Sequence, residues 1–428
     1  MSGSALTTRS EELYRRALGV LPGGVNSPVR AMAAIGRDPI FIERGSGSRV
    51  WDVDGNEYID WVSSWGPLIL GHAHPRVVAA VAEAGARGTS FGAPTAAEVE
   101  LACEVAGRMP SVEMMRMTCS GTEASMSAIR LARAVTEREK VLKFAGAYHG
   151  HVDGLLAEGG SGLATQGIPA SPGVPAATTA ATVVVPWNRP DALPDLRDFA
   201  AVLVEPIPAN MGLVPPNEGF LELLRAQAHA AGALLIFDEV ITGFRVARGG
   251  AQERFGVLPD ITLMGKVVGG GLPAGAYGGR RELMERIAPA GDVYQAGTLS
   301  GNPLATAAAI AVLRQLDDAA YERLAATTDS LVRGLREAAG EAGLPLAVQS
   351  VPGLMTPFFS DRPVVDYSAA KRSDLDAYAV FARALLERGV YPPPSQFEAW
   401  FPSLAHTQGD IEFTLEAARD ALAQVAAR

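Results

Sequence analysis

The sequence has few cysteines and no cluster of metal-ligating side chains. Cys103 and Cys119 are the two cysteines among 428 residues, and no Cys/His spacing is typical of a zinc site. Two thiols in a chain of this length do not make a disulfide framework and indicate a reducing compartment. We therefore expect a protein without a bound metal that resides in the cytoplasm.

Long apolar runs and long basic runs are also absent. No segment is apolar over the length that a bilayer requires, and the N-terminus lacks the apolar core of a signal peptide. The formal net charge is -10, and the sequence contains no long run of lysine and arginine residues. These features argue against a membrane or a nucleic acid as partner and favour a small-molecule substrate.

What remains is an ordinary globular composition, with 48% hydrophobic and 20% charged residues. From about residue 75, apolar segments such as "ALLIFDEV" alternate with amphipathic segments such as "NEGFLELLRAQAHAAG". This alternation predicts strands at 140–144, 181–187, 201–207 and 233–240, and helices at 74–88, 96–109, 123–136 and 217–232. Continuous apolar strands between helices are typical of a mostly parallel sheet covered on both faces.

The sequence therefore predicts an α/β fold with two parts. A large domain would comprise residues 71–316. The flanking segments 1–70 and 317–428 mix short strands with helices, and we expect them to pack together as a smaller α+β domain. Residues 50–61 predict a β-hairpin that turns at Asp54 and Gly55.

Polar residues follow the predicted strands, at the sheet edge where α/β proteins bind ligands. Asp238 ends one buried strand, and Lys266 ends a later one, just before the glycine-rich turn "VVGGGLPAG". Each residue alone has an ordinary explanation, because a buried carboxylate can form an ion pair or a helix cap and a lysine can extend to water. Together they form the pair that pyridoxal phosphate requires, a lysine for the Schiff base and an aspartate for the ring nitrogen.

Two further segments supply what this cofactor needs. Ser120, Gly121 and Thr122 precede a predicted helix, whose free amides and dipole favour a phosphate, although the same residues suit a plain helix cap. Tyr148 and His149 follow a predicted strand and offer an aromatic ring to stack on the cofactor. No lysine of a nucleotide-binding loop follows "SGT", and the glycines of "GGGLPAG" lack dinucleotide-fingerprint spacing.

One long segment has no periodicity. Residues 157–179 are rich in glycine, alanine, proline, serine and threonine. Such a segment within a compact domain is often a lid over an active site, and a surface excursion is the alternative.

Several segments resemble one known family over nearly the whole chain. "SGTEA", "DEVITGFR" and "GKVVGGGLPAGAYGG" are similar to the class III, fold-type-I pyridoxal-phosphate enzymes. "GGVNSPVRA", "AGTLSGNPLA" and "PPSQFEA" are similar to the aminomutases of that family, which act on glutamate-1-semialdehyde. The resemblance implies an isomerase that moves the amino group of (S)-4-amino-5-oxopentanoate through a diamine to give 5-aminolevulinate, in tetrapyrrole biosynthesis.

The resemblance also implies a homodimer with active sites at the interface, pyridoxal 5'-phosphate as cofactor, and its pyridoxamine form in the cycle. Lys266 would be the catalytic residue. Cofactor contacts would come from Ser120, Gly121, Thr122, Tyr148, Glu205, Asn210, Asp238 and Lys266, with Thr298 reaching from the partner subunit. Substrate contacts would come from Ser27, Arg30, Trp65 and Glu398, with Arg30 taking the carboxylate, and residues 157–175 would close over the site.

The chain departs from the family pattern at Cys119, at Pro208 and Ala209, and at Trp400, and none of these changes removes a catalytic group. Three alternatives stay open. An ordinary class III aminotransferase would use the same lysine, aspartate and phosphate site with an outside amino donor, and Arg245 could then bind the carboxylate of a second substrate. The second alternative is a regulator that binds the cofactor without catalysis, and the third is an α/β protein in which Lys266 has only a structural role.

Overall fold

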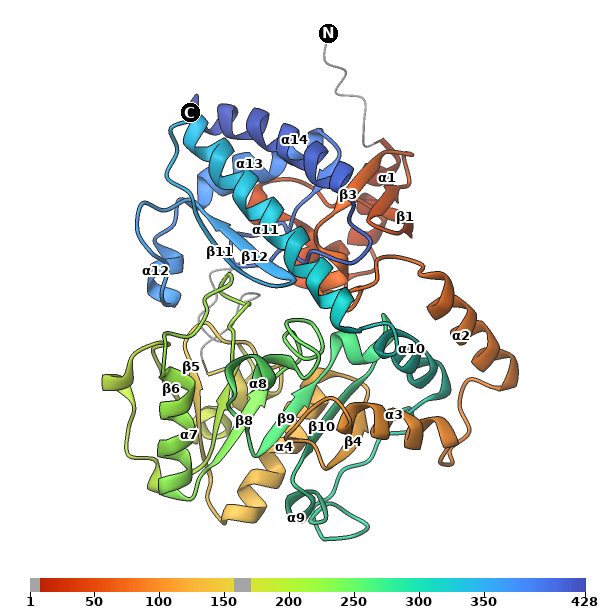
Figure 1. The fold of residues 1–428 in the computed structure, drawn as a ribbon, viewed down its shortest axis with the longest axis vertical. Coiled ribbons are helices and arrows are strands. Elements are labelled where there is room, and N and C mark those ends of the chain that lie inside the picture. Colours follow the sequence, from red (N-terminus) through yellow and green to blue (C-terminus); the bar gives the residue numbers. More distant parts are fainter. Residues whose placement is uncertain (1–7, 158–170) are drawn as a thin grey trace.

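A mixed sheet forms the centre of the larger part of the molecule (Figure 1). The computed structural model describes residues 8–157 and 171–428, and within them this sheet has seven strands in the order β4-β10-β9-β8-β7-β5-β6. β10 runs antiparallel to both neighbours, and the remaining pairs are parallel, so the predicted mostly parallel sheet is confirmed. The strands are β4 (Met114–Thr118), β5 (Lys140–Phe144), β6 (Thr182–Val185), β7 (Phe199–Val204), β8 (Leu234–Asp238), β9 (Ile261–Met264) and β10 (Gly275–Gly279).

Helices cover both faces of this sheet, which is why its central strands are mostly apolar and fully buried. Alternate side chains of β7 point to opposite faces: Leu203 packs in the cluster that includes α4, whereas Val204 packs in the cluster that includes α7. The helices of this part are α2 (Pro75–Arg87), α3 (Ala96–Ala106), α4 (Gly121–Thr136), α6 (Ala176–Thr179), α7 (Phe220–Ala231), α8 (Gly250–Phe255), α9 (Arg281–Met284) and α10 (Pro303–Leu313). The predicted strands and helices are confirmed, with shifts of a few residues at their ends.

The two ends of the chain form one further layer. β1 (Ile42–Ser46), β2 (Arg49–Asp52), β3 (Glu57–Asp60) and β13 (Val390–Tyr391) make a four-stranded sheet, in which β13 pairs with β3 in parallel. The predicted hairpin is the antiparallel pair β2–β3. The other elements of these end segments are α1 (Thr8–Leu18), α11 (Asp318–Glu341), β11 (Ala347–Val351), β12 (Leu354–Phe358), α12 (Tyr367–Lys371), α13 (Leu375–Glu387) and α14 (Gln408–Ala426).

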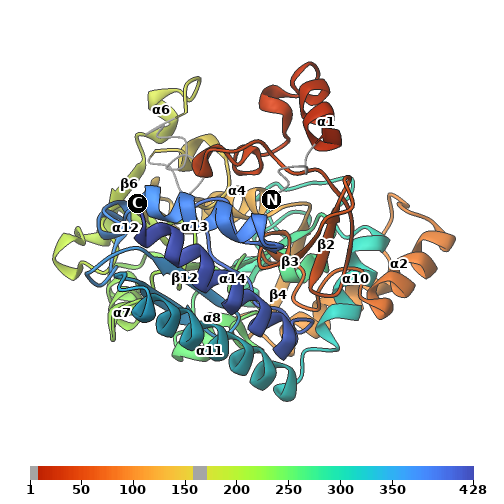
Figure 2. The same cartoon turned by 90° about the horizontal axis from the view of Figure 1, so that it is seen from above.

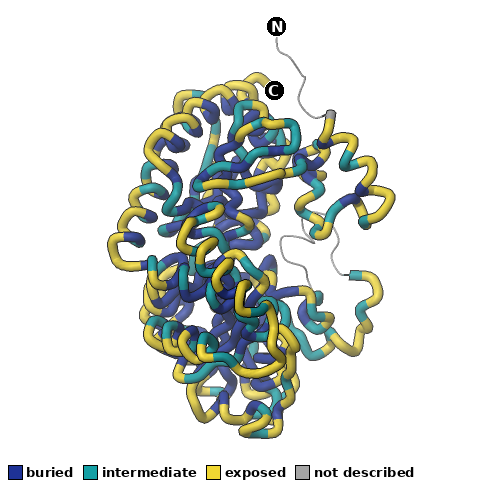
Figure 3. The backbone as a smooth tube through the Cα atoms, turned by 90° about the vertical axis from the view of Figure 1, so that its right-hand side faces the viewer, coloured by how far each residue is buried: buried dark blue, intermediate teal, exposed yellow. Residues whose placement is uncertain are grey.

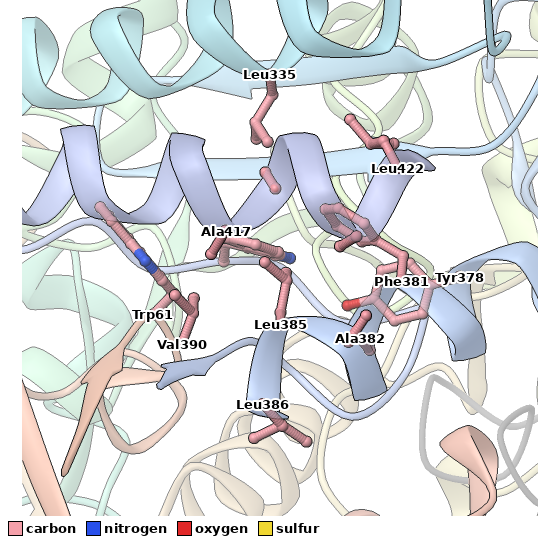
Figure 4. Packing of buried hydrophobic residues seen from close by; sticks show 14 of the residues in the cluster. Trp61, Leu335, Tyr378, Phe381, Ala382, Leu385, Leu386, Val390, Ala417 and Leu422 are labelled. Carbon is pink, nitrogen blue, oxygen red and sulfur yellow. The ribbon is translucent and has the colours of Figure 1, made fainter. Parts of the chain in front are cut away.

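Side chains from both ends share a hydrophobic core. Trp61 belongs to one buried cluster with Leu335, Leu385 and Leu422, which come from α11, α13 and α14 (Figure 4). Seen from above, these three helices lie together beside the N-terminal strands (Figure 2). Buried residues occupy the interior of both layers (Figure 3). The end segments therefore pack together as expected, while the division into domains at residues 70 and 316 stays a prediction.

In the described ranges, no helix combines the length and the apolar character needed to cross a membrane.

Candidate active site

A cavity of about 230 Å³ lies where β5, β7, β8 and β9 end at the edge of the large sheet. Parallel strands place their carboxyl ends together, so the residues that follow each strand converge there. Of the predicted site residues, the cavity brings together Gly121, Thr122, Tyr148, Glu205, Asn210, Asp238 and Lys266.

Lys266 stands two residues after β9, as the first residue of the short 3-10 helix η8 (Lys266–Gly269). Its backbone has a φ of 49°, in the left-handed region that is unfavourable for residues other than glycine. Burial lowers the pKa of its amine, and the nearby charge of Arg245 lowers it further, against the carboxylates of Glu398, Glu205 and Asp238, which raise it. The amine is thereby shifted toward its neutral, nucleophilic form.

Asp238 ends β8 and is 5% exposed. Its Oδ2 lies 2.7 Å from His149 Nδ1, and its Oδ1 accepts the Val240 amide at 3.1 Å. The His149 ring is buried, and its Nε2 has no hydrogen-bond partner among the described residues. The contact to Asp238 fixes the position of the carboxylate, which remains at the cavity wall to meet a cationic ligand atom.

The N-terminus of α4 borders another side of the cavity. Ser120 is its N-cap, and its Oγ accepts the Glu123 amide at 3.2 Å. The amides of Gly121 and Thr122 lie in the first turn, where the helix offers them no carbonyl, so they are available to an anion. Gly150 packs against Thr122 so closely that a Cβ on it would lie 2.5 Å from Thr122 Oγ1.

Glu205 organises the segments after β5 and β7. Its Oε1 accepts the Tyr148 amide at 2.8 Å, and its Oε2 accepts the Ala209 amide at 3.1 Å and Asn210 Nδ2 at 2.9 Å. Burial raises the pKa of the Glu205 carboxyl, and the charge of Asp238 adds to this. These bonds hold Tyr148 and Asn210 at the cavity, with the Tyr148 side chain 38% exposed.

A second cavity, of about 480 Å³, is lined by Arg30 and Trp65 together with Asp60, His72 and Tyr391. One backbone segment borders both cavities. Trp65 lines the second cavity, and a Cβ on the next residue, Gly66, would lie 3.5 Å from the Lys266 side chain, which lines the first.

The remaining predicted residues lie outside the lining of both cavities. Glu398 is buried, and its charge raises the pKa values of Lys266 and Tyr148. Ser27 precedes the short helix that carries Arg30. Thr298 is exposed. Most of the predicted lid, residues 158–170, falls outside the described residues.

Arg245 does not face either cavity. It is fully buried, and it donates hydrogen bonds to the carbonyl oxygens of Gly353 at 3.2 Å, Pro402 at 3.0 Å and Gly66. Burial lowers the pKa of its guanidinium to about 9. Because its donors are directed at the backbone, Arg245 is not placed to bind the carboxylate of a second substrate.

Val240 is a cavity residue that the sequence does not identify as part of the site, and His149, which the sequence offers beside Tyr148 as an aromatic residue for the cofactor ring, contacts Asp238. The motif "AYHGH" shows His149 beside Tyr148, but not that it contacts Asp238. Val240 separates the two glycine-containing turns, since a Cβ on Gly121 would lie 3.1 Å from it and one on Gly265 would lie 3.0 Å from it. Neither contact has a sequence signal.

Comparison with known proteins identifies the family. Residues 32–421 match the class-III aminotransferases. The chain belongs to this family. It is 58% identical over 425 residues to the glutamate-1-semialdehyde 2,1-aminomutase of Roseiflexus castenholzii (98% of each chain), and 55% identical over 420 residues to that of Desulfitobacterium hafniense strain Y51 (97% of this chain, 98% of the relative).

Two solved structures show the same fold. An omega-transaminase from Sphaerobacter thermophilus has a TM-score of 0.90 at 34% identity, covering 98% of both chains. A lysine-to-alanine variant of a glutamate-1-semialdehyde-aminomutase from Pseudomonas aeruginosa PAO1, in complex with PMP, has a TM-score of 0.87 at 28% identity, covering 97% of this chain and 94% of the other.

The donor set of the first cavity fits pyridoxal phosphate, the cofactor of this family. The α4 amides suit the phosphate, Asp238 suits a cationic ring nitrogen, and the amine of Lys266 suits the aldehyde.

Proposed function

We propose that the protein is a glutamate-1-semialdehyde 2,1-aminomutase, which converts (S)-4-amino-5-oxopentanoate to 5-aminolevulinate for tetrapyrrole biosynthesis. One observation carries the proposal. Lys266, Asp238 and the first-turn amides of α4 line a single cavity, in a chain that is 54–58% identical to enzymes of that name over almost its full length.

Pyridoxal phosphate, when bound, supplies an electron sink and a carrier for the amino group. Gly121 and Thr122 would bind its phosphate through their amides, with Ser120 fixing the helix start and Thr298 contributing from a partner subunit. Asp238 would hold the protonated ring nitrogen. Tyr148 would stack on the ring, and Glu205 and Asn210 would lie on the side of the ring hydroxyl.

Lys266 is the residue we assign to proton transfer. Its lowered pKa leaves a larger neutral fraction of the amine at physiological pH than an exposed lysine has, so it can accept a proton from the reacting substrate carbon and return it. The carboxylates of Glu398, Glu205 and Asp238 stabilise the ammonium that forms in between. One group can thus act as both base and acid.

Arg30 and Trp65 would bind the substrate in the second cavity, with the Arg30 guanidinium pairing with the substrate carboxylate. Ser27 and Glu398 would complete this side. The aldehyde carbon of the substrate would receive an amino group from the pyridoxamine form of the cofactor, which gives 4,5-diaminopentanoate. The amino group on the neighbouring carbon would then return to the cofactor, so substrate and product are isomers and no outside donor is consumed.

An ordinary aminotransferase would need a site for the carboxylate of a second substrate. Arg245, the candidate for that role, has its donors directed at the carbonyl oxygens of Gly66, Gly353 and Pro402. This arrangement favours the aminomutase.

We also propose that two copies of the chain form the active enzyme in the cytoplasm. Large apolar side chains are exposed on α2, after it and before α10: Val78 is 53% exposed, Phe91 is 53% exposed and Leu299 is 50% exposed. An apolar groove of about 380 Å³ lies on the same helix, α2. Exposed apolar surface is typical of an interaction site, and Thr298 immediately precedes Leu299 in the sequence.

The test is a product assay. Purified protein with bound cofactor is given glutamate-1-semialdehyde without any amino donor or acceptor, and 5-aminolevulinate is measured over many turnovers. We expect steady formation by the wild type and none by Lys266→Ala, with folding of the variant checked by circular dichroism. Absence of product from the wild type, with a cofactor spectrum that still responds to simple amines and oxo acids, would instead indicate an aminotransferase.

A further inference from the structure

A turn with unfavourable backbone geometry lies at the wall of the second cavity. Ser63, Ser64 and Trp65 all have left-handed φ values, of 46°, 56° and 68°, and Gly66 follows with φ of 111°. The left-handed region is disfavoured for every residue with a Cβ, and consecutive residues of this kind are rare. Such geometry persists only where the surrounding structure holds it in place, and it concentrates at functional sites.

The carboxylate of Asp60 holds the start of this turn. Its Oδ1 accepts the Val62 amide at 2.8 Å and the Ser63 amide at 3.2 Å, and its Oδ2 lies 2.6 Å from His72 Nε2. Ser63 Oγ adds a bond of 3.1 Å to the carbonyl oxygen of Phe401. The first half of the turn is therefore fixed by one buried anion and one buried backbone carbonyl.

Arg245 holds the end of the turn. Its guanidinium donates to the Gly66 carbonyl and, from the same fork, to those of Gly353 and Pro402, and it lies 5.3 Å from the centre of the Phe401 ring. Among the described residues, no carboxylate forms an ion pair with it. A buried cation without a counter-ion is costly, so the turn combines two unfavourable features at one place.

The turn connects the two cavities. Trp65 lines the cavity that holds Arg30, whereas Gly66 lies against the catalytic lysine. A Cβ on Gly66 would come within 2.8 Å of the Phe401 ring and 3.5 Å of Lys266 Cδ, so a glycine is required where the turn passes the lysine. A shift at this position would move Trp65 and the backbone beside Lys266 together.

We propose that Arg245 is a positioning residue for substrate recognition. It forces the turn at residues 63–66 into its left-handed form, so that Trp65 faces the substrate and Gly66 supports the stem of Lys266. The inference rests on the proposed function in one respect, namely that the substrate occupies the cavity lined by Arg30 and Trp65.

The experiment compares Arg245→Lys, Ser64→Gly and the double variant with the wild type. Lysine keeps the cation but loses the planar fork that reaches three carbonyls. Glycine at position 64 adopts the left-handed form without strain. Arg138→Lys is the matched control, because Arg138 also donates to two backbone carbonyls, those of Phe199 and Ala231, but does so away from both cavities.

The first readout is the thermal unfolding midpoint, which does not depend on substrate. Ser64→Gly should raise the unfolding midpoint more in the wild-type background than in the Arg245→Lys background. The reason is that the turn is forced into its left-handed form only while the Arg245 guanidinium is present. Equal shifts in the two backgrounds would overturn the proposal, whatever the protein catalyses.

The second readout is the dissociation constant of 5-aminolevulinate for the holoenzyme, followed through the cofactor absorbance, together with KM and kcat. Arg245→Lys should raise both the dissociation constant and KM at least fivefold and change kcat less. Adding Ser64→Gly should recover at least half of that loss on a logarithmic scale, and Arg138→Lys should stay within twofold of the wild type. A dissociation constant within twofold for Arg245→Lys would overturn the proposal.

If Arg245→Lys does not fold, Gly66→Ala replaces it, since the added methyl displaces the turn while Arg245 stays. It too should raise the dissociation constant at least fivefold, and an unchanged value would overturn the proposal. A wild type that neither binds nor forms 5-aminolevulinate would refute the proposed function alone, because the unfolding comparison still decides whether Arg245 holds the turn.

Discussion

The contact between His149 and Asp238 predicts how tightly the cofactor is held. His149→Leu removes the donor 2.7 Å from Asp238 Oδ2 and leaves that oxygen buried with no replacement. An Asp238 carboxylate that is free to rotate no longer pairs well with a cationic ring nitrogen. Hydrogen bonds to charged groups contribute about 1.5–3 kcal/mol, which corresponds to roughly 10- to 150-fold in a binding constant.

The assay is a titration of each apoprotein with pyridoxal phosphate, followed by absorbance. We expect His149→Leu to bind the cofactor about 10- to 150-fold more weakly than the wild type. His149→Asn should stay close to the wild type, because the asparagine amide can place a donor where Nδ1 stood. His151→Asn is the control, since His151 is an exposed histidine of the same loop. Equal affinities for the leucine and asparagine variants would refute this reasoning.

Three further predictions follow from particular contacts. Gly150→Ala should lower both the affinity for pyridoxal phosphate and the stability to urea, the latter by about 1–2 kcal/mol or more, because φ is 84° there and the methyl would press on Thr122; an unchanged cofactor titration would contradict this. The wild-type apoprotein should gain stability relative to Lys266→Met as pH rises from the lowered pKa of Lys266 toward its ordinary 10.5, because in that window the unfolded lysine binds the proton more tightly than the folded one. Urea unfolding at several pH values measures this difference in unfolding free energy. A difference that does not change with pH would show that burial does not shift the pKa. Val78→Glu combined with Leu299→Glu should convert the proposed dimer to monomers in sedimentation velocity, and an unchanged sedimentation coefficient would move the interface elsewhere.

The sequence predicts the central strands well because their chemistry is uniform. β7 and β8 are continuous apolar runs rich in residues that favour strands, and each is completely buried. The carboxyl ends of such strands are also where a parallel sheet gathers its ligand-binding residues. For this reason Asp238 and Lys266 could be paired from the sequence before any contact was known.

Two strands at the edge of the same sheet escape prediction. β4, "MMRMT", has one β-branched residue, and β10, "GAYGG", consists largely of glycine, which is depleted in strands. The glycines of β10 reflect crowding rather than flexibility, since a Cβ on Gly278 would lie 2.7 Å from Val112 and one on Gly275 would collide with the carbonyl of Ser120. That carbonyl belongs to the cap of α4, so the packing that hides β10 from prediction also brings the strand against the phosphate-binding turn.

The geometry around Trp65 could not be predicted either. Nothing in "VSSWG" indicates three consecutive residues with left-handed φ values. Asp60 holds the start of the turn from nearby in sequence, but the contacts from Phe401 and Arg245 come from far away. Likewise, a motif shared across a family can mark Arg245 as important without showing that its donors are directed at backbone carbonyls. Tertiary contacts decide both features.

The pairing of β3 with β13 has a consequence for synthesis of the protein. Ile59 and Trp61 are made early, but the residues that bury them, Val390 and Leu422 among them, are made near the end. At translation rates of about 5–20 residues per second, this interval lasts roughly 15–70 s, during which the N-terminal strands lack their core. The central α/β layer can meanwhile form from consecutive segments. The nascent chain thus carries an exposed apolar hairpin beside a largely assembled sheet, and we expect this hairpin to be the segment most prone to aggregation until the C-terminal helices are made.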